Sequence, residues 1–257
     1  TKAQLSLEKE FISNIESLNE SNKHSLNLHE LSQEKLLIPK QITNGISKGL
    51  KSILTPEASS WIEKAFGSLI GSPKKVTLSN EQSNAVLSLV NGKDLVCLSG
   101  MPGTGKSTVM AKLVEEYTNH GYEVVGGATS AVASLNLATE ANVKAYTLAK
   151  WQHDWNFRED LERAGQEVRY SLPNLTSKNV MIVDEMSMVD LKMFNYITSK
   201  VVEAGAKLIV LGDNNQFSAI GIGGASERIV EKAENVDLTE LFRQRATLDK
   251  EITRKLS

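Results

Sequence analysis

Five short apolar runs, separated by longer amphipathic stretches, constrain the fold of this chain more than any other feature. Between these runs, apolar residues recur at the spacing of a helix, as in residues 106–120 and 191–203. Apolar, β-branched-rich strands that alternate with helices are typical of a parallel sheet buried on both faces. We therefore predict an α/β domain with a mainly parallel sheet. The runs are Asp94 to Gly100, Tyr122 to Thr129, Asn179 to Glu185, Ala206 to Asp213 and Asn235 to Leu241.

A glycine-rich segment, GMPGTGKS, follows the first run and leads into a helical stretch. It matches GxxxxGK[ST], in which backbone amides and a helix amino terminus face phosphate oxygens. Lys106 would reach the β and γ phosphates, and the Ser107 hydroxyl would bind Mg²⁺. The alternative, a simple glycine-rich turn, fits the strand-to-helix position less well. We expect nucleotide to be bound by Met101, Pro102, Gly103, Thr104, Gly105, Lys106, Ser107 and Thr108.

An acidic pair ends the third run, NVMIVDE. Ligands of open α/β sheets collect at the carboxyl ends of the strands. We expect Asp184 to hold Mg²⁺ through water and Glu185 to polarise the attacking water. A strand followed by two solvated acids is common, so this interpretation depends on the phosphate-binding loop that precedes it.

A second polar tip follows the fourth run, LIVLGDNNQ. Asp213 and Gln216 would reach the same edge of a parallel sheet as Asp184. The Gln216 amide could orient the attacking water or touch the γ phosphate. Taken alone, the segment would be a strand followed by a turn.

Six segments together resemble the helicase motifs of the RecD-like branch of superfamily 1, and more narrowly the helicase part of TraA-type conjugative relaxases. The resemblance covers roughly residue 78 to the end of the chain. It implies a RecA-like P-loop NTPase domain that uses ATP and Mg²⁺ and moves 5′ to 3′ on single-stranded DNA. The segments are GMPGTGKST, GGATSAVASLNL, AYTLAKWQHDW, VMIVDEMSMVD, GDNNQFSAIGIGGA and LTELFRQR.

The resemblance assigns roles to further residues. Gln82, in LSNEQ, is similar to the glutamine of the family's Q motif and would read the adenine edge. Arg243, in LFRQR, falls where the family keeps an arginine that stabilises charge on the γ phosphate. An ordinary surface arginine is the alternative for Arg243.

DNA contacts are also implied by the resemblance. Thr129, Ser130 and Ala131 lie in a segment like motif Ia, and Thr147 and Trp151 lie in a segment that would add contacts to the strand.

Two tryptophans invite a base-stacking role, because aromatic rings bind unpaired bases without regard to sequence. Trp151 and Trp155 are four residues apart, however, which also fits one buried helix face, and we favour core packing for at least one of them. His24 and His29 lie in a polar segment that we interpret as a loose join, and they do not form the paired histidine cluster of a relaxase nuclease.

Composition limits the binding partners and the cellular compartment that we expect for this chain. With 29 Lys and Arg against 31 Asp and Glu in 257 residues, the chain does not have the strongly basic balance of many nucleic-acid-binding proteins. Any basic groove must be local. Cys97 is the only cysteine and lies in an apolar run, so we expect a buried core residue and a reducing compartment. No apolar run is long enough for a membrane helix, and we expect a cytoplasmic protein that does not contact a membrane.

The predicted organisation has three parts: a helical segment at residues 1–72, a RecA-like ATPase domain at 73–240, and the start of a second motor domain at 241–257. The turn-rich segment GSPKK sets the first boundary. The chain opens on Thr1 and stops shortly after Arg243, so we expect a piece of a larger protein that binds nucleotide, hydrolyses it weakly and does not unwind DNA alone.

Three functions remain open at this stage. The leading one is the first motor domain of a DNA helicase from a conjugative relaxase, a monomer with single-stranded DNA and conjugation proteins as partners. The second is a P-loop ATPase or small-molecule kinase of another type. The third is a truncated remnant that binds nucleotide or DNA without turnover.

Overall fold

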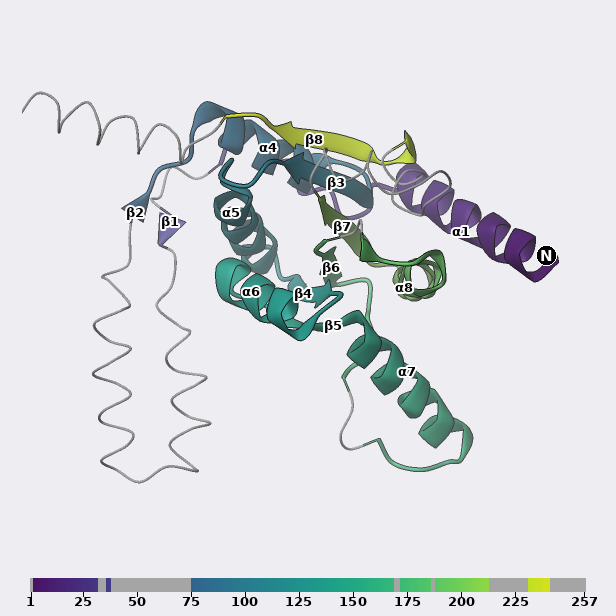
Figure 1. Cartoon of the computed structure of the whole chain (residues 1–257). Coiled ribbons are helices and arrows are strands. Elements are labelled where there is room, and N and C mark those ends of the chain that lie inside the picture. The colour runs from purple at the N-terminus through teal and green to yellow at the C-terminus, as the bar shows by residue number, and fades with distance from the viewer. Residues whose placement is uncertain are drawn as a thin grey trace, which may run out of the picture. The chain divides into compact units, whose positions relative to one another are not determined.

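The computed structural model describes residues 2–31, 36–37, 75–168, 172–185, 188–212 and 231–240 (Figure 1). The chain divides into two compact units, one formed by residues 1–31 with 80–257 and the other by residues 32–79. In the second unit the described residues include a short antiparallel pair, β1 (Leu36–Leu37) with β2 (Lys75–Val76). The sheet and helices that follow belong to the first unit.

A six-stranded sheet forms the centre of the first unit, in the order β5-β4-β6-β7-β3-β8. Every neighbouring pair is parallel. The predicted α/β fold with a parallel sheet is therefore confirmed, and each predicted run overlaps one strand. Within this sheet, the sequence did not predict β5, a short strand at one edge. The strands are β3 (Leu95–Gly100), β4 (Glu123–Ala128), β5 (Lys144–Thr147), β6 (Asn179–Val183), β7 (Lys207–Gly212) and β8 (Glu234–Leu238).

Helices cover both faces of the sheet (Figure 1). One layer contains α4 (Asn80–Asn91), α5 (Lys106–Asn119) and α6 (Ala131–Ala141). The opposite layer contains α1 (Lys2–Glu20), α7 (Leu148–Arg163) and α8 (Leu191–Ala204). Among the described residues no helix is long and apolar enough to cross a membrane.

The alternation of side chains along β3 shows why this sheet needs two layers. All six residues of β3 are buried. Leu95 and Cys97 belong to the core cluster beneath α1, α7 and α8, and Val96 and Leu98, which alternate with them, point to the other face. Burial raises the pKa of the Cys97 thiol to about 12, so Cys97 is the inert core residue that the sequence predicts.

The amino-terminal helix α1 is an integral part of this second layer. Phe11, Ile15 and Leu18 recur at helical spacing and are each at most 4% exposed. The ring of Phe11 meets the ring of Phe194 on α8 edge to face, with 5.9 Å between centroids. The helix predicted in this part of the chain is thus present and packed on α8. Apolar residues at helical spacing in WIEKAFGSLI, residues 61–70, predict a further helix, but these residues lie outside the described ones.

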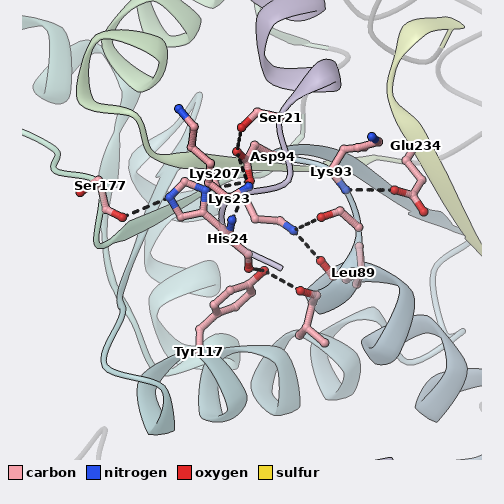
Figure 2. A network of polar contacts seen from close by, with 12 residues as sticks. Ser21, Lys23, His24, Leu89, Lys93, Asp94, Tyr117, Ser177, Lys207 and Glu234 are labelled. Carbon is pink, nitrogen blue, oxygen red and sulfur yellow. Dashed lines mark hydrogen bonds and ion pairs between the residues drawn. The ribbon is translucent and has the colours of Figure 1, made fainter. Parts of the chain in front are cut away.

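A buried polar network holds the segment after α1 against the start of β3 (Figure 2). The Asp94 carboxylate accepts hydrogen bonds from the Ser21 hydroxyl and from Nδ1 of His24 at 2.8 Å. Backbone amides of Lys23 and His24 donate to it as well, at 3.2 and 3.1 Å. Burial by itself raises the pKa of Asp94, but the hydrogen bonds from His24 and Ser21 outweigh it and hold that pKa below its usual value.

The loose join predicted around residues 24–39 is therefore wrong for residues 24–31, whereas residues 32–35 and 38–39 lie outside the described ones. His24 is 2% exposed, and its Nε2 lies 3.1 Å from the carbonyl oxygen of Ser177. The Leu28 amide donates to Asn91 Oδ1 on α4 at 2.7 Å. Polar composition misled the prediction because the partners of His24 and of the Leu28 backbone are distant in the chain and become neighbours only in the folded protein.

Candidate nucleotide-binding site

The loop between β3 and α5 has the backbone geometry of a phosphate cradle. Gly103 and Gly105 have φ values of 96° and 88°, which only glycine adopts without strain. Gly105 precedes the first turn of α5, and no side chain caps that helix. The Thr104 hydroxyl donates to the Met101 carbonyl at 2.9 Å and closes the loop. Because the capping residue Gly105 has no side chain, the cap position supplies no acceptor that would compete with a phosphate for the first amides of α5.

The lysine and serine of the motif begin α5. The Lys106 ammonium donates a hydrogen bond to the Gly100 carbonyl at the end of β3. The Ser107 hydroxyl donates to Oε2 of Glu140, which comes from α6. The sequence did not single out Glu140, because it lies 33 residues from Ser107 and belongs to no motif.

The acidic pair follows β6 at the carboxyl edge of the same sheet. The Asp184 amide donates to the Gly127 carbonyl of β4 at 2.9 Å. Burial raises the pKa of Asp184, and the negative charges of Glu185 and Glu140 add to this, while the Glu185 amide and Lys106 oppose it. The two sequence-predicted groups, P-loop and acidic pair, therefore interact electrostatically.

Glu185 has an unusual backbone. Its φ of 53° lies in the left-handed region, where residues other than glycine are uncommon. The Glu185 amide donates to Oδ1 of Asp184 at 2.9 Å, and its carbonyl accepts from the Met188 amide at 3.0 Å. The turn leaves the Glu185 side chain exposed at the end of the strand, and strained backbone of this kind clusters at functional sites.

Gln82 approaches the loop from α4. It is 4% exposed, and its Nε2 donates to the Thr104 carbonyl at 3.4 Å. Its neighbour Glu81 was not predicted to matter. Glu81 accepts hydrogen bonds from the Thr239 amide and hydroxyl, at 2.8 and 2.7 Å, just beyond the end of β8.

The residues of the motif Ia segment lie at the carboxyl end of β4. Ser130 caps α6 by accepting a hydrogen bond from the Ala133 amide at 3.1 Å. Ser130 and Ala131 are exposed, and Thr129 is half-buried. Thr147 caps α7 in the same way, accepting from the Lys150 amide at 3.1 Å. Two predicted DNA contacts therefore also have a local role as helix caps.

The two tryptophans are core residues. Trp151 and Trp155 are each 1% exposed, with ring centroids 5.0 Å apart. Nε1 of Trp151 donates to the Gly126 carbonyl at 2.8 Å. Neither ring therefore offers a free face on which a base could stack. Thr147 stays a predicted DNA contact of this segment, and Trp151 does not.

Two predicted site residues, Gln216 and Arg243, lie outside the described residues, as does Asp213. Their proposed roles stay predictions. Within the part that the structure describes, no group of three or more His, Cys, Asp or Glu residues could hold a metal ion. Mg²⁺ is commonly bound through one or two protein oxygens together with nucleotide phosphates. The Ser107 hydroxyl and the Asp184 carboxylate supply oxygens of this kind.

A parallel sheet of this strand order, with a P-loop after β3 and an acidic pair after β6, defines a RecA-like P-loop NTPase domain. A family model described as an AAA domain matches residues 77–257, and the chain belongs to this family.

Curated relatives include helicases and conjugation proteins. The chain is 34% identical over 168 residues to "Conjugal transfer protein TraA" of Agrobacterium fabrum. This match covers 65% of this chain and 14% of that protein. It is 30% identical over 177 residues to "ATP-dependent RecD2 DNA helicase" of Deinococcus radiodurans, covering 68% of this chain and 23% of that protein. The chain therefore spans only a small part of these relatives.

A solved structure of the Pif1 helicase from Candida albicans is also similar. It has a TM-score of 0.45 and 21% identity, and the match covers 66% of this chain and 42% of that one. Together with the family match and the curated relatives, the sheet and its loops make this a helicase-like P-loop ATPase domain related to TraA and RecD.

Proposed function

We propose that this chain is the ATP-binding motor domain of a 5′-to-3′ DNA helicase of the RecD-like kind, working in a conjugative relaxase. It would bind MgATP and single-stranded DNA in the cytoplasm, as a monomer, with conjugation proteins as partners. The observation that supports the proposal best is the convergence of three segments at one sheet edge. The P-loop follows β3, the acidic pair follows β6, and the motif Ia segment follows β4, in a sheet whose strands all run the same way.

Each of these residues has a task that its position suits. Lys106 and the amides of 103–108 would bind the phosphates, because a helix amino terminus and a cation both favour anions. Ser107 and Asp184 would hold Mg²⁺, which neutralises charge on the phosphates when it is bound. Glu185 would accept a proton from the attacking water, and its exposed position at the strand end leaves room for that water. Gln82 would contact adenine beside the loop, and Gln216 and Arg243 would complete the site.

DNA would lie across the carboxyl edge of the sheet. Thr129, Ser130 and Ala131 would bind the backbone of the strand through hydroxyls and amides, as phosphate contacts commonly do. Because β4 neighbours β6, this segment is next to the strand that carries Asp184. The proposed DNA contacts and the acidic pair are thus carried by neighbouring β-strands, β4 and β6.

Calorimetry with MgATP tests the nucleotide site. We expect wild type to bind, and Lys106→Ala to bind about 10- to 100-fold more weakly, the usual loss for a hydrogen bond to a charged group. Lys93→Ala is a matched control, because Lys93 is exposed and lies just before β3, at the opposite end of the strand from the P-loop. Wild type that binds no MgATP would contradict the proposal.

Turnover with and without single-stranded DNA tests the motor assignment. We expect DNA to stimulate ATP hydrolysis, and Glu185→Gln to lower the rate by about 10² to 10⁴, the usual contribution of a general base. ATP turnover that DNA does not affect would favour a P-loop enzyme of another type. Binding without turnover would favour a non-catalytic binding domain.

A further inference from the structure

One carboxylate near the P-loop has no role in the mechanism above. Glu140 lies near the carboxyl end of α6 and accepts a hydrogen bond from the Ser107 hydroxyl. Its negative charge also contributes, after burial and alongside Glu185, to the raised pKa of Asp184. Glu140 therefore contacts Ser107 and acts electrostatically on Asp184, the two residues that would hold Mg²⁺.

The hydroxyl of Ser107 needs a partner for its hydrogen when its oxygen binds a cation. A serine hydroxyl has one hydrogen and two lone pairs. If a lone pair is directed at Mg²⁺, the hydrogen must point to an acceptor elsewhere, or the hydroxyl loses a hydrogen bond. In the described part of the chain, Oε2 of Glu140 accepts this hydrogen. Partners of this kind orient metal ligands and tune their affinity.

We propose that Glu140 is a positioning residue of the magnesium site, which keeps its hydrogen bond from Ser107 in the nucleotide-bound protein and so turns a lone pair of the hydroxyl toward Mg²⁺. This inference rests on the proposed function, because it takes Ser107 to be a magnesium ligand. Glu140 acts through Ser107 and does not touch the nucleotide.

A competing role for Glu140 predicts the opposite sign. If Glu140 only held Ser107 in the nucleotide-free protein, Mg²⁺ would have to break the contact, and removing Glu140 would strengthen magnesium-dependent binding. Without Mg²⁺, both roles predict equal or tighter nucleotide binding on removal, because a negative charge near the phosphates is lost. The dependence on Mg²⁺ therefore separates them.

The experiment is calorimetry of AMP-PNP, a non-hydrolysable ATP analogue, measured with Mg²⁺ and with EDTA. The ratio of the two dissociation constants gives the gain in affinity that Mg²⁺ supplies. We expect Glu140→Ala to lower this gain roughly tenfold or more, the usual effect of losing such an outer partner. Glu140→Gln should keep most of the gain, because an amide oxygen accepts the same hydrogen bond. Glu162→Ala, which removes an exposed acid of α7, should leave it unchanged.

A second comparison ties the effect to Ser107. In a Ser107→Ala background, Glu140→Ala should have no further effect on the magnesium gain, because the two residues act as one unit. Independent effects of the two substitutions would overturn the proposal, and so would an unchanged or larger gain in Glu140→Ala alone. If wild type binds AMP-PNP under neither condition, the proposed function itself fails. If it binds and only the Glu140 results disagree, the inference alone fails.

Discussion

At the scale of single residues, the buried charge of Asp184 at the candidate magnesium site lowers the unfolding free energy of the protein when no metal is bound. Burial raises the pKa of this carboxyl above its usual 3.8. A carboxyl with a raised folded-state pKa favours folding while it is protonated, and this contribution is lost as the pH rises through that pKa. In EDTA at pH 7 we expect Asp184→Asn to be more stable than wild type by about 0.5 to 2 kcal/mol, a common gain when a functional group is removed. Urea unfolding measures this, and the difference should shrink as the pH falls toward 3.8.

Lys207 gives a residue-scale prediction at high pH. It is 0% exposed, and its ammonium donates to the carbonyls of Leu89 and Gly92 at the end of α4, at 2.8 and 3.1 Å. Burial lowers the pKa of Lys207 from 10.5 to about 8. Between these values the unfolded chain binds the proton more tightly, so stability rises with pH across this window.

The comparison variant is Lys207→Met, which has no proton to lose. From pH 8 to 10.5 we expect wild type to gain roughly 3 kcal/mol of unfolding free energy relative to this variant. Urea unfolding at the two pH values measures the gain. If the difference in unfolding free energy between the two proteins does not change with pH, burial does not lower the pKa of Lys207.

The sequence could predict positions that are set by local order. Gly103 to Ser107 follow a strand and begin a helix, and Asp184 directly follows a strand. The roles of these residues in binding stay predictions. Glu140 and Lys207 could not be predicted, because their partners become neighbours only when the sheet forms.

At the scale of elements, α1 is the part whose importance is easiest to test. Phe11 is fully buried against Phe194, and truncating a buried phenylalanine costs about 3 to 5 kcal/mol. We expect Phe11→Ala to lower the unfolding free energy by this amount. Leu5→Ala is the control, because Leu5 is on the same helix and 54% exposed; it should change stability by less than about 0.5 kcal/mol. Equal effects of the two variants in urea unfolding would contradict the packing of α1 described above.

Elements were predictable where their hydrophobic period was clear. The five predicted runs each overlap one strand. Every residue of β3, β6 and β7 is buried, and strands buried on both faces of a parallel sheet read as continuous apolar runs. The edge strand β5 was missed, since its four residues are partly exposed and merge with the helix that follows. The apolar face of α1 was visible as a pattern, but periodicity does not say which surface covers it, so its packing on α8 needed the structure.

For the molecule as a whole, the question is whether the first unit unfolds as one body. α1 and the P-loop are joined through β3, which contributes to the core beneath α1 and ends at the loop. A ligand that binds only the folded form stabilises everything that unfolds with it, by about 2.7 kcal/mol at a concentration 100 times its dissociation constant. Hydrogen exchange resolves this by segment.

We expect MgATP at that concentration to slow amide exchange in α1 and in β7 by a similar factor, although neither belongs to the P-loop. Lys106→Ala, which weakens phosphate binding, should show little slowing at the same concentration. Slowing confined to residues 101–108 would mean that α1 opens independently of the nucleotide site. Equal slowing would mean that stability gained at the nucleotide edge extends to the amino-terminal helix, and that Phe11→Ala should in turn weaken the apparent affinity for MgATP once unfolded protein becomes populated.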